Sequence, residues 1–330
     1  MSIPLKILYA ASNNSGAKIQ LARFMKEMQG KPYIIKVAAY KKSSPQINID
    51  WTLNCLLNIY KPELLSLDND NFSIYLDQVK YFAPDLIISD LEYFTSQVAN
   101  ALNITLWQCS SSMLNFALSH EEKYNLGAFK HYSYVLNKHP LHTQRTVNLI
   151  DNSNCNFVYS HLGDIENSPS LKEQFEWIRP YYISGKLSIP CQHNVVAATL
   201  GNNKRIIHLL KNHSDSVVFS DFDGEEYSNL LMKDIGNETE YSCNLKNSNI
   251  FVCEGQTSFL ADAFYNQKYS VILTDLKDAE CILNAAFAEK AQISSAIYDS
   301  QIDLDVYMNK QIVNQLNDKS KFLHERIDEL

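Results

Sequence analysis

The stretch Asn249-Ile-Phe-Val-Cys-Glu-Gly-Gln-Thr-Ser-Phe-Leu-Ala-Asp-Ala-Phe264 places a short apolar run directly before a glycine turn and a second apolar run. A short continuous run is typical of a buried strand, and the second run has the spacing of a helix. Gly255 permits a sharp turn because it lacks a Cβ, and Thr257 or Ser258 can cap the helix that follows. Outward N–H groups at such a helix end attract anions, so a diphosphate ligand is the first hypothesis. The alternative is an ordinary strand-to-helix turn of an α/β protein.

Glycine is scarce in this chain. It has nine glycines in 330 residues, about 3% against an average of roughly 7%. Gly16, Gly201 and Gly255 each lie where an apolar run gives way to a helical pattern. This coincidence favours the anion-site interpretation over that of an ordinary turn.

Strand and helix patterns alternate along the whole chain. In the first half the expected strands are 5–10, 33–39, 84–90, 104–109 and 156–159, and the expected helices are 17–29, 72–82, 96–102 and two or three within 111–150. In the second half the expected strands are 194–200, 216–220, 249–253, 269–273 and 292–297, and the expected helices are 204–212, 238–245, 257–266, 278–290 and a long one near 307–327. Such alternation predicts α/β architecture, with parallel sheets, right-handed crossovers and helices on both faces.

The length favours two domains, because one hydrophobic core rarely grows past roughly 250 to 300 residues. Hydrophobic residues make up 45% of the chain and charged residues 20%, which is a normal globular composition. Periodicity is lost around residues 180–190, and a second alternating series follows. We therefore expect a Rossmann-like domain over 1–187 and another over 188–330, whose terminal helix could pack back on the first.

Composition also limits the partners and the compartment. A net charge of −8 argues against a generic nucleic-acid binder. The seven cysteines form no CxxC pair or Cys/His cluster, so they indicate reduced core thiols. There is no signal segment, and no apolar run approaches the ~20 residues of a membrane span. We therefore expect a cytoplasmic protein without an integral membrane segment.

The dinucleotide-binding, P-loop and common hydrolase motifs are missing. Neither half carries G-x-G-x-x-G or G-x-x-x-x-G-K-[ST], which argues against hydride transfer and kinase chemistry. No G-x-S-x-G or H-E-x-x-H occurs either. Two strand-turn-helix anion sites remain: Gly201, Asn202 and Asn203 form one, and Glu254, Gly255, Gln256, Thr257 and Ser258 form the other. Asp262 follows the second site and can bond ribose or sugar hydroxyls, whereas Lys204 could either neutralise a phosphate or lie solvated.

The order of residues from Cys253 to Glu280 resembles the donor-site signature of the GT-B glycosyltransferases, in particular the groups of the lipid II-forming enzyme and of plant and bacterial nucleotide-sugar transferases. A Gly turn follows a strand, Thr or Ser opens the helix, and an acid, an apolar strand and an acidic loop come next. This resemblance implies two Rossmann-like domains that face a central cleft. It assigns residues 255–258 to the diphosphate, Asp262 to the ribose, and Asp278 with Glu280 to the hydroxyls of the transferred sugar.

The first half resembles the same family in Pro84-Asp-Leu-Ile-Ile-Ser-Asp90 and the following residues 97–104. In many members an acid here supports a His of the first loop, which removes the acceptor proton. That His is absent, because the loop reads Ser12-Asn-Asn-Ser-Gly16. Asp90 is therefore either the base itself or a helix cap. In the second case the candidates for the base are Glu92, His120, Glu121 and His131.

The resemblance implies transfer of a sugar from a nucleoside diphosphate sugar, UDP-type, to an acceptor hydroxyl. The step would proceed with inversion, without a metal, and without a cofactor besides the donor substrate itself. The acceptor stays open among a glycan, a lipid, a small molecule and a modified nucleic acid. Three alternatives remain: a sugar-nucleotide epimerase or hydrolase, a DNA-base glycosyltransferase of viral type, and a non-catalytic nucleotide-sugar-binding protein.

Overall fold

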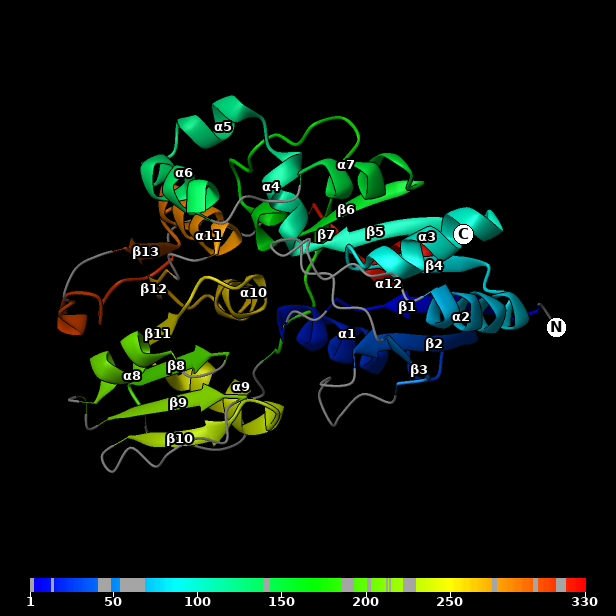
Figure 1. Ribbon diagram of the computed structural model, residues 1–330. Coiled ribbons are helices and arrows are strands. Elements are labelled where there is room, and N and C mark those ends of the chain that lie inside the picture. The colour runs from blue at the N-terminus through cyan, green and yellow to red at the C-terminus, as the bar shows by residue number, and fades with distance from the viewer. Residues whose placement is uncertain are drawn as a thin grey trace.

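The computed structural model describes residues 3–12, 15–40, 49–53, 69–138, 143–184, 193–200, 203–211, 213, 215–221, 230–274, 278–298, 302–312 and 319–330. They form two separate parallel sheets with helices packed against them (Figure 1). The predicted α/β architecture with two Rossmann-like units is confirmed. We call residues 3–184 with 319–330 the N-lobe, and residues 193–312 the C-lobe. The predicted boundary at 187/188 lies outside the described residues.

The N-lobe sheet has the order β14-β7-β6-β5-β4-β1-β2-β3. Its strands are β1 (Leu5–Ala10), β2 (Tyr33–Tyr40), β3 (Trp51–Leu53), β4 (Leu86–Ser89), β5 (Thr105–Ser110), β6 (Cys155–Tyr159), β7 (Glu176–Arg179) and β14 (Lys321–Phe322). Its helices are α1 (Ser15–Glu27), α2 (Asn69–Phe82), α3 (Tyr93–Leu102), α4 (Leu114–Ala117), α5 (His120–Tyr124), α6 (Phe129–Lys138), α7 (Thr143–Asp151) and α12 (Leu323–Ile327), with 3-10 turns η2 (Ser111–Met113) and η3 (His161–Asp164). Helices cover both faces, so the central strands are continuous apolar runs.

The C-lobe sheet has the order β10-β9-β8-β11-β12-β13. Its strands are β8 (Val195–Thr199), β9 (Ser216–Ser220), β10 (Leu231–Asp234), β11 (Ile250–Cys253), β12 (Ser270–Leu273) and β13 (Ser294–Ile297). Its helices are α8 (Lys204–Leu210), α9 (Glu238–Asn247), α10 (Thr257–Tyr265) and α11 (Ala279–Lys290), with the 3-10 turn η4 (Leu304–Val306). Every ladder between these strands is parallel, so their carboxyl ends lie at one edge of the sheet.

The long helix predicted near residues 307–327 is wrong. Its described residues form turns after η4, then β14 and the five-residue helix α12. β14 pairs in parallel with β7, with Lys321 opposite Ile178, so the chain returns to the N-lobe sheet. Leu323 and Ile327 are buried in the N-lobe core. Tertiary packing of these side chains therefore favours the strand and short helix over the long helix that the sequence pattern predicted. Strands β3, β7, β10 and β14 were not predicted either. β3 and β14 have only three and two residues, and β7 and β10 are partly exposed strands that contain charged residues, unlike the buried apolar runs that were predicted.

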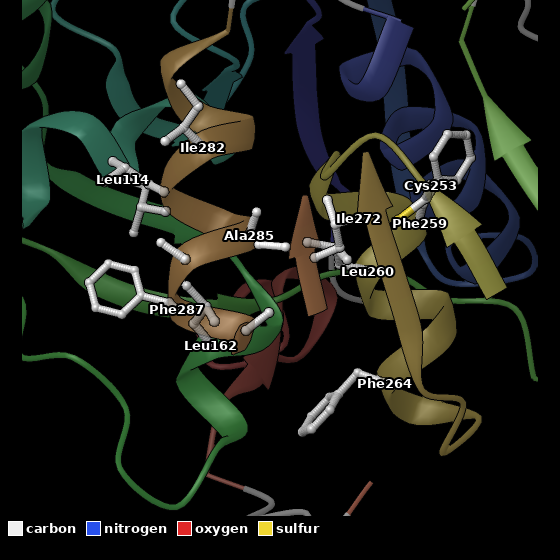
Figure 2. Packing of buried hydrophobic residues seen from close by; sticks show 14 of the residues in the cluster. Leu114, Leu162, Cys253, Phe259, Leu260, Phe264, Ile272, Ile282, Ala285 and Phe287 are labelled. Carbon is white, nitrogen blue, oxygen red and sulfur yellow. The ribbon is translucent and has the colours of Figure 1, made fainter. Parts of the chain in front are cut away.

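A hydrophobic core continues from one lobe into the other. Helix α11 is buried over residues 279–288, and most of these residues are apolar. Figure 2 shows its Ile282, Ala285 and Phe287 beside Leu114 of α4 and Leu162 of η3, both from the N-lobe. This packing brings the N-terminus of α11 close to the carboxyl ends of the N-lobe strands. Among the described residues, no helix combines the length and apolar character that a membrane span requires.

Candidate active site

The turn between β11 and α10 needs a glycine, as predicted. Gly255 has φ +101°, and a Cβ there would lie 2.9 Å from the carbonyl oxygen of Cys281. The prediction that Thr257 or Ser258 caps the helix is wrong. Gln256 is the N-cap residue, and its side chain accepts no hydrogen bond from the first turn of α10. A helix end without a side-chain cap keeps N–H donors for an anion.

A cavity of about 50 Å³ lies between the two lobes. Its described lining is Tyr9, Gly16, Ala17, Gln20, Asp90, Cys109, Ser111 and Tyr159 from the N-lobe, with Gln256, Thr257, Ser258, Asp278 and Glu280 from the C-lobe. The N-lobe residues lie at or after the carboxyl ends of β1, β4, β5 and β6, except those of α1. The C-lobe residues surround the N-termini of α10 and α11. Carboxyl ends of parallel strands are where open α/β folds bind ligands. The structure thus gathers six of the predicted site residues around one cavity.

Asp90 directly follows β4 and lines this cavity. Its N–H donates to the carbonyl of Ala10 over 2.9 Å, and the hydroxyl of Ser12 donates to its Oδ2 over 2.6 Å. Burial raises the pKa of Asp90, and hydrogen bonds from Ser110 and Ser12 oppose the shift. A buried carboxylate with a raised pKa at a cavity wall suits a proton acceptor.

Asp278 and Glu280 begin helix α11. Asp278 is the N-cap residue, and its Oδ1 accepts from the N–H of Glu280 over 2.9 Å. Glu280 joins the lobes: Ser112 of η2 donates to Oε2 over 2.7 Å and Thr257 of α10 donates to Oε1 over 3.3 Å. Burial, with the Asp278 charge as the next cause, raises the pKa of Glu280 to about 7.

Glu254 binds neighbouring side chains of the C-lobe and does not line the cavity. It accepts hydrogen bonds from the hydroxyl of Thr199 and from Gln256 Nε2, the latter over 2.6 Å. These bonds hold the ends of β8 and β11 together. Burial raises the pKa of Glu254, and these bonds and one from Asn203 oppose the shift.

The other predicted anion site has its helix end already capped. The side chain of Asn203 accepts from the N–H groups of Arg205 and Ile206, and Lys204 is exposed. These amides are therefore satisfied without a ligand. Gly201 and Asn202 lie outside the described residues.

The predicted ribose contact of Asp262 does not fit this arrangement. The side chain is fully buried, and Arg23 of α1 donates to both oxygens, over 3.0 and 2.8 Å. The N–H of Ile183 donates to Oδ1 over 2.8 Å. One turn earlier, Gln20 of α1 donates to the Ser258 hydroxyl over 3.0 Å. Asp262 and Ser258 therefore fasten α10 to α1 across the lobes.

None of the other candidates for the base lies at the described cavity wall. Glu92 is the N-cap of α3 and accepts from the N–H groups of Phe94 and Thr95. His120 and Glu121 lie on α5. His131 stacks on Tyr298 with ring centroids 4.7 Å apart. Asp90 is thus the one of these five acids and histidines that lines the cavity.

A larger cavity of about 460 Å³ lies elsewhere, beside the chain crossing between the lobes. Its described lining is Arg23, Lys26, Glu27, Tyr181, Tyr182, Ile183, Ser184, Glu238, Thr239, Ser242, Phe322 and His324. This described lining includes no predicted site residue, no residue at a strand carboxyl end of the C-lobe sheet and no residue of the α10 N-terminus. Size alone therefore does not locate the chemistry, and we place the candidate site at the smaller cavity.

Three uncharged polar residues of the site were not predicted from the sequence. Tyr9, Cys109 and Tyr159 line the cavity beside Asp90. Burial raises the pKa of each group, so the phenols stay protonated and can donate hydrogen bonds. A signal was present, because all three lie in the last two residues of β1, β5 and β6. In the described part of the chain, no group of three or more His, Cys, Asp or Glu side chains is arranged to hold a metal ion.

Solved structures of other proteins share this arrangement of two lobes. The spinosyn forosaminyltransferase SpnP is 14% identical, with 92% of this chain and 88% of that chain covered and a TM-score of 0.60. The Streptomyces sp. SF2575 glycosyltransferase SsfS6 is 10% identical, with 88% and 87% covered and a TM-score of 0.56. A UDP-GlcNAc 2-epimerase from Neisseria meningitidis bound to UDP-GlcNAc is 14% identical, with 88% and 87% covered and a TM-score of 0.51. No family model matches the sequence, and a comparison with curated proteins finds no match.

Proposed function

We propose, from the premise that this chain has the GT-B fold, that it is a glycosyltransferase using a nucleoside diphosphate sugar, UDP-type. The observation that carries the proposal is the interlobe cavity, where Asp90 of one lobe faces the N-termini of α10 and α11 of the other. Solved structures with this fold include proteins bound to UDP or to UDP-GlcNAc. The acceptor would be held mainly by the N-lobe.

In the proposed step an acceptor hydroxyl attacks the anomeric carbon with inversion. Asp90 takes the hydroxyl proton, because it lines the cavity. The bond from the anomeric carbon to the diphosphate oxygen breaks, and its electron pair stays on that oxygen. Main-chain N–H groups of residues 255–258 and the dipole of α10 stabilise the departing charge. Asp278 lies at the same cavity wall, where it can contact the transferred sugar.

Substrate entry requires movement of the site. A cavity of about 50 Å³ is far smaller than the roughly 300 to 1,000 Å³ of small-molecule sites. The hydroxyl of Ser258 is already held by Gln20 of the opposite lobe. We propose that donor binding separates this contact and widens the cavity, since the diphosphate must reach the first turn of α10.

Direct binding and turnover test the proposal. In a thermal-shift screen against UDP, UDP-glucose, UDP-GlcNAc and other nucleotide sugars, at least one ligand should raise the melting temperature of the protein. Asp90→Asn should keep that binding and lower the rate of sugar transfer about 10²- to 10⁴-fold. Asp85→Asn is a matched control at the opposite end of the same strand, where Asp85 Oδ2 accepts from the N–H of Lys6. Absence of binding to every nucleotide and nucleotide sugar would refute the proposal.

Epimerisation of a nucleotide sugar is the second candidate function. It is favoured by the structural likeness to UDP-GlcNAc 2-epimerases and by a cavity whose described charged residues are all acids: Asp90, Asp278 and Glu280. An epimerase converts UDP-GlcNAc without an acceptor, which proton NMR detects directly. Binding without any turnover would instead favour a non-catalytic nucleotide-sugar-binding protein. A DNA acceptor is not favoured, since the described lining contains no lysine or arginine.

A further inference from the structure

We infer that Glu280 binds the donor in its protonated form, by donating a hydrogen bond to the diphosphate, so that binding of a nucleotide sugar takes up a proton. The inference rests on the proposed function, because it concerns the same donor site. It gives Glu280 a different partner from the sugar hydroxyls that the sequence resemblance implies.

Glu280 is buried beside the proposed diphosphate site. Its carboxyl group is buried, with the residue 5% exposed, and Oε1 lies 3.3 Å from the hydroxyl of Thr257. Thr257 is the first residue of α10, whose uncapped N-terminus is the proposed diphosphate site. A diphosphate bound there would therefore lie next to the Glu280 carboxyl group.

The electrostatic surroundings of Glu280 disfavour its ionised form. Asp278, the N-cap of its own helix, and Asp90, which follows β4, both raise its pKa by their negative charge. Tyr9, Tyr159 and Cys109 are neutral, since burial raises the pKa of each. Four elements pack against α11: α4, α6, β13 and η3. The sequences of α4 and β13 contain no charged residue, and that of α6 contains Lys130, His131 and Lys138. In η3, burial lowers the pKa of His161, which keeps it neutral, and Asp164 pairs with Arg179. The described cavity wall thus offers no cation to balance an ionised Glu280.

A protonated carboxyl group resolves this conflict. An ionised Glu280 would set two acceptor oxygens against the acceptor oxygens of the diphosphate, and like charges would repel. A protonated Glu280 donates an O–H to a phosphate oxygen, a charge-assisted bond that is stronger than a neutral one. The hydroxyl of Ser112 donates to Oε2 over 2.7 Å, whereas the bond from Thr257 to Oε1 is longer, at 3.3 Å. Oε1, the oxygen with the weaker bond and on the Thr257 side, is therefore the one that would carry the proton. Burial raises the pKa of Glu280 to about 7, so the proton is available near neutral pH.

Calorimetry measures the proton directly. UDP-glucose and UDP-GlcNAc are suitable probes, because their diphosphate lacks the terminal monoester group that titrates near pH 6. Titrations at several pH values, in buffers with different heats of ionisation, should show uptake of up to about one proton per ligand. The affinity should fall by up to about tenfold for each pH unit above about 7.

Two variants separate this role from a structural one. Glu280→Gln supplies an N–H donor at every pH, so it should bind both probes without proton uptake and with an affinity that no longer depends on pH. Glu289→Gln is the matched control on the same helix, where Glu289 accepts from the N–H of Ala296 over 3.2 Å. It should keep the proton uptake of the unmodified protein.

Three results would overturn the inference. The first is binding of a probe with no proton uptake, and the second is a Glu280→Gln variant that keeps the pH dependence while changing only the melting temperature. The third is binding that needs Mg²⁺ and loses that need in Glu280→Gln, which would make Glu280 an ionised metal ligand. Each of these three results would contradict only the inference and would remain compatible with the proposed function. If neither the two probes nor any other nucleotide sugar binds, both the proposed function and the inference are wrong.

Discussion

Replacing Arg23 by methionine should destabilise the protein strongly, because it leaves a buried charge unpaired. Arg23 donates to Asp262 over 3.0 and 2.8 Å and to the carbonyl of Tyr181 over 2.8 Å. Arg23 is 6% exposed and Asp262 fully buried. In the variant, Asp262 keeps the hydrogen bond from the N–H of Ile183 but loses its buried counter-charge.

The size of the effect follows from that burial. Removing one partner of a buried ion pair costs about 3 to 5 kcal/mol. At roughly 2 to 4 °C per kcal/mol for a large domain, the melting temperature should fall by about 10 °C. Burial already raises the pKa of Asp262 and Arg23 opposes that shift, so the variant should raise it further. The destabilisation should therefore shrink as the pH falls, because a protonated Asp262 needs no counter-charge.

Urea unfolding followed by circular dichroism measures this difference. Lys26→Met is the matched control, one turn further along α1. It breaks a pair with Glu238 at 2.9 Å in which the Lys26 side chain is 65% exposed, so it should cost less than about 1 kcal/mol. The double variant Arg23→Met with Asp262→Leu should recover part of the loss. If Arg23→Met and Lys26→Met differ by less than about 1 kcal/mol, the interlobe ion pair does not stabilise the fold as argued.

Three further predictions concern other points of the fold. Gly255→Ala should lower the free energy of unfolding by about 1 to 3 kcal/mol and weaken nucleotide-sugar binding. Its φ is +101°, and an added Cβ would lie 2.9 Å from the carbonyl oxygen of Cys281. Calorimetry measures both effects, with Gly127→Ala as the control, because nothing lies within 4 Å of a Cβ at Gly127. Asp164→Asn should loosen residues 319–330, because Asp164 accepts from the N–H groups of Lys319 and Ser320, and faster amide exchange there would show it. The raised pKa of Glu280 stabilises the fold below pH 4.5, and this contribution is lost as the pH rises to about 7. Its full size is about 3 kcal/mol. Denaturation curves of Glu280→Gln should lack this component, and an unchanged pH profile would contradict it.

The strand ends and helix starts of the site were predictable because they are local. Gly255 and its turn follow from a single stretch of sequence, and the structure shows the positive φ that only glycine adopts easily. Asp90 and Glu280 come from separate motifs, each at the end of a strand or the start of a helix. Parallel sheets place such positions at one edge, so the motifs predicted a shared site before any contact was known.

The contacts across the lobes were not predictable in the same way. Asp262 had the spacing of a ligand-binding acid, yet its partner Arg23 is 239 residues away on an ordinary amphipathic helix. Nothing in the spacing of α1 distinguishes Arg23 from a solvated arginine. The start of α10 is a second example. The residue type of Thr257 suits a helix cap, but its hydroxyl donates to Glu280 instead. Tertiary partners decided both positions.

The return of residues 319–330 to the N-lobe constrains the order in which the protein can assemble during synthesis. β14 pairs with β7, and α12 lies beside the N-lobe sheet (Figure 1). Leu323 and Ile327 are buried in the N-lobe core. A ribosome releases these residues only after it has made the entire C-lobe. During translation the β7 edge of the N-lobe sheet therefore stays unpaired until the C-lobe has been synthesised, because β14 is made last.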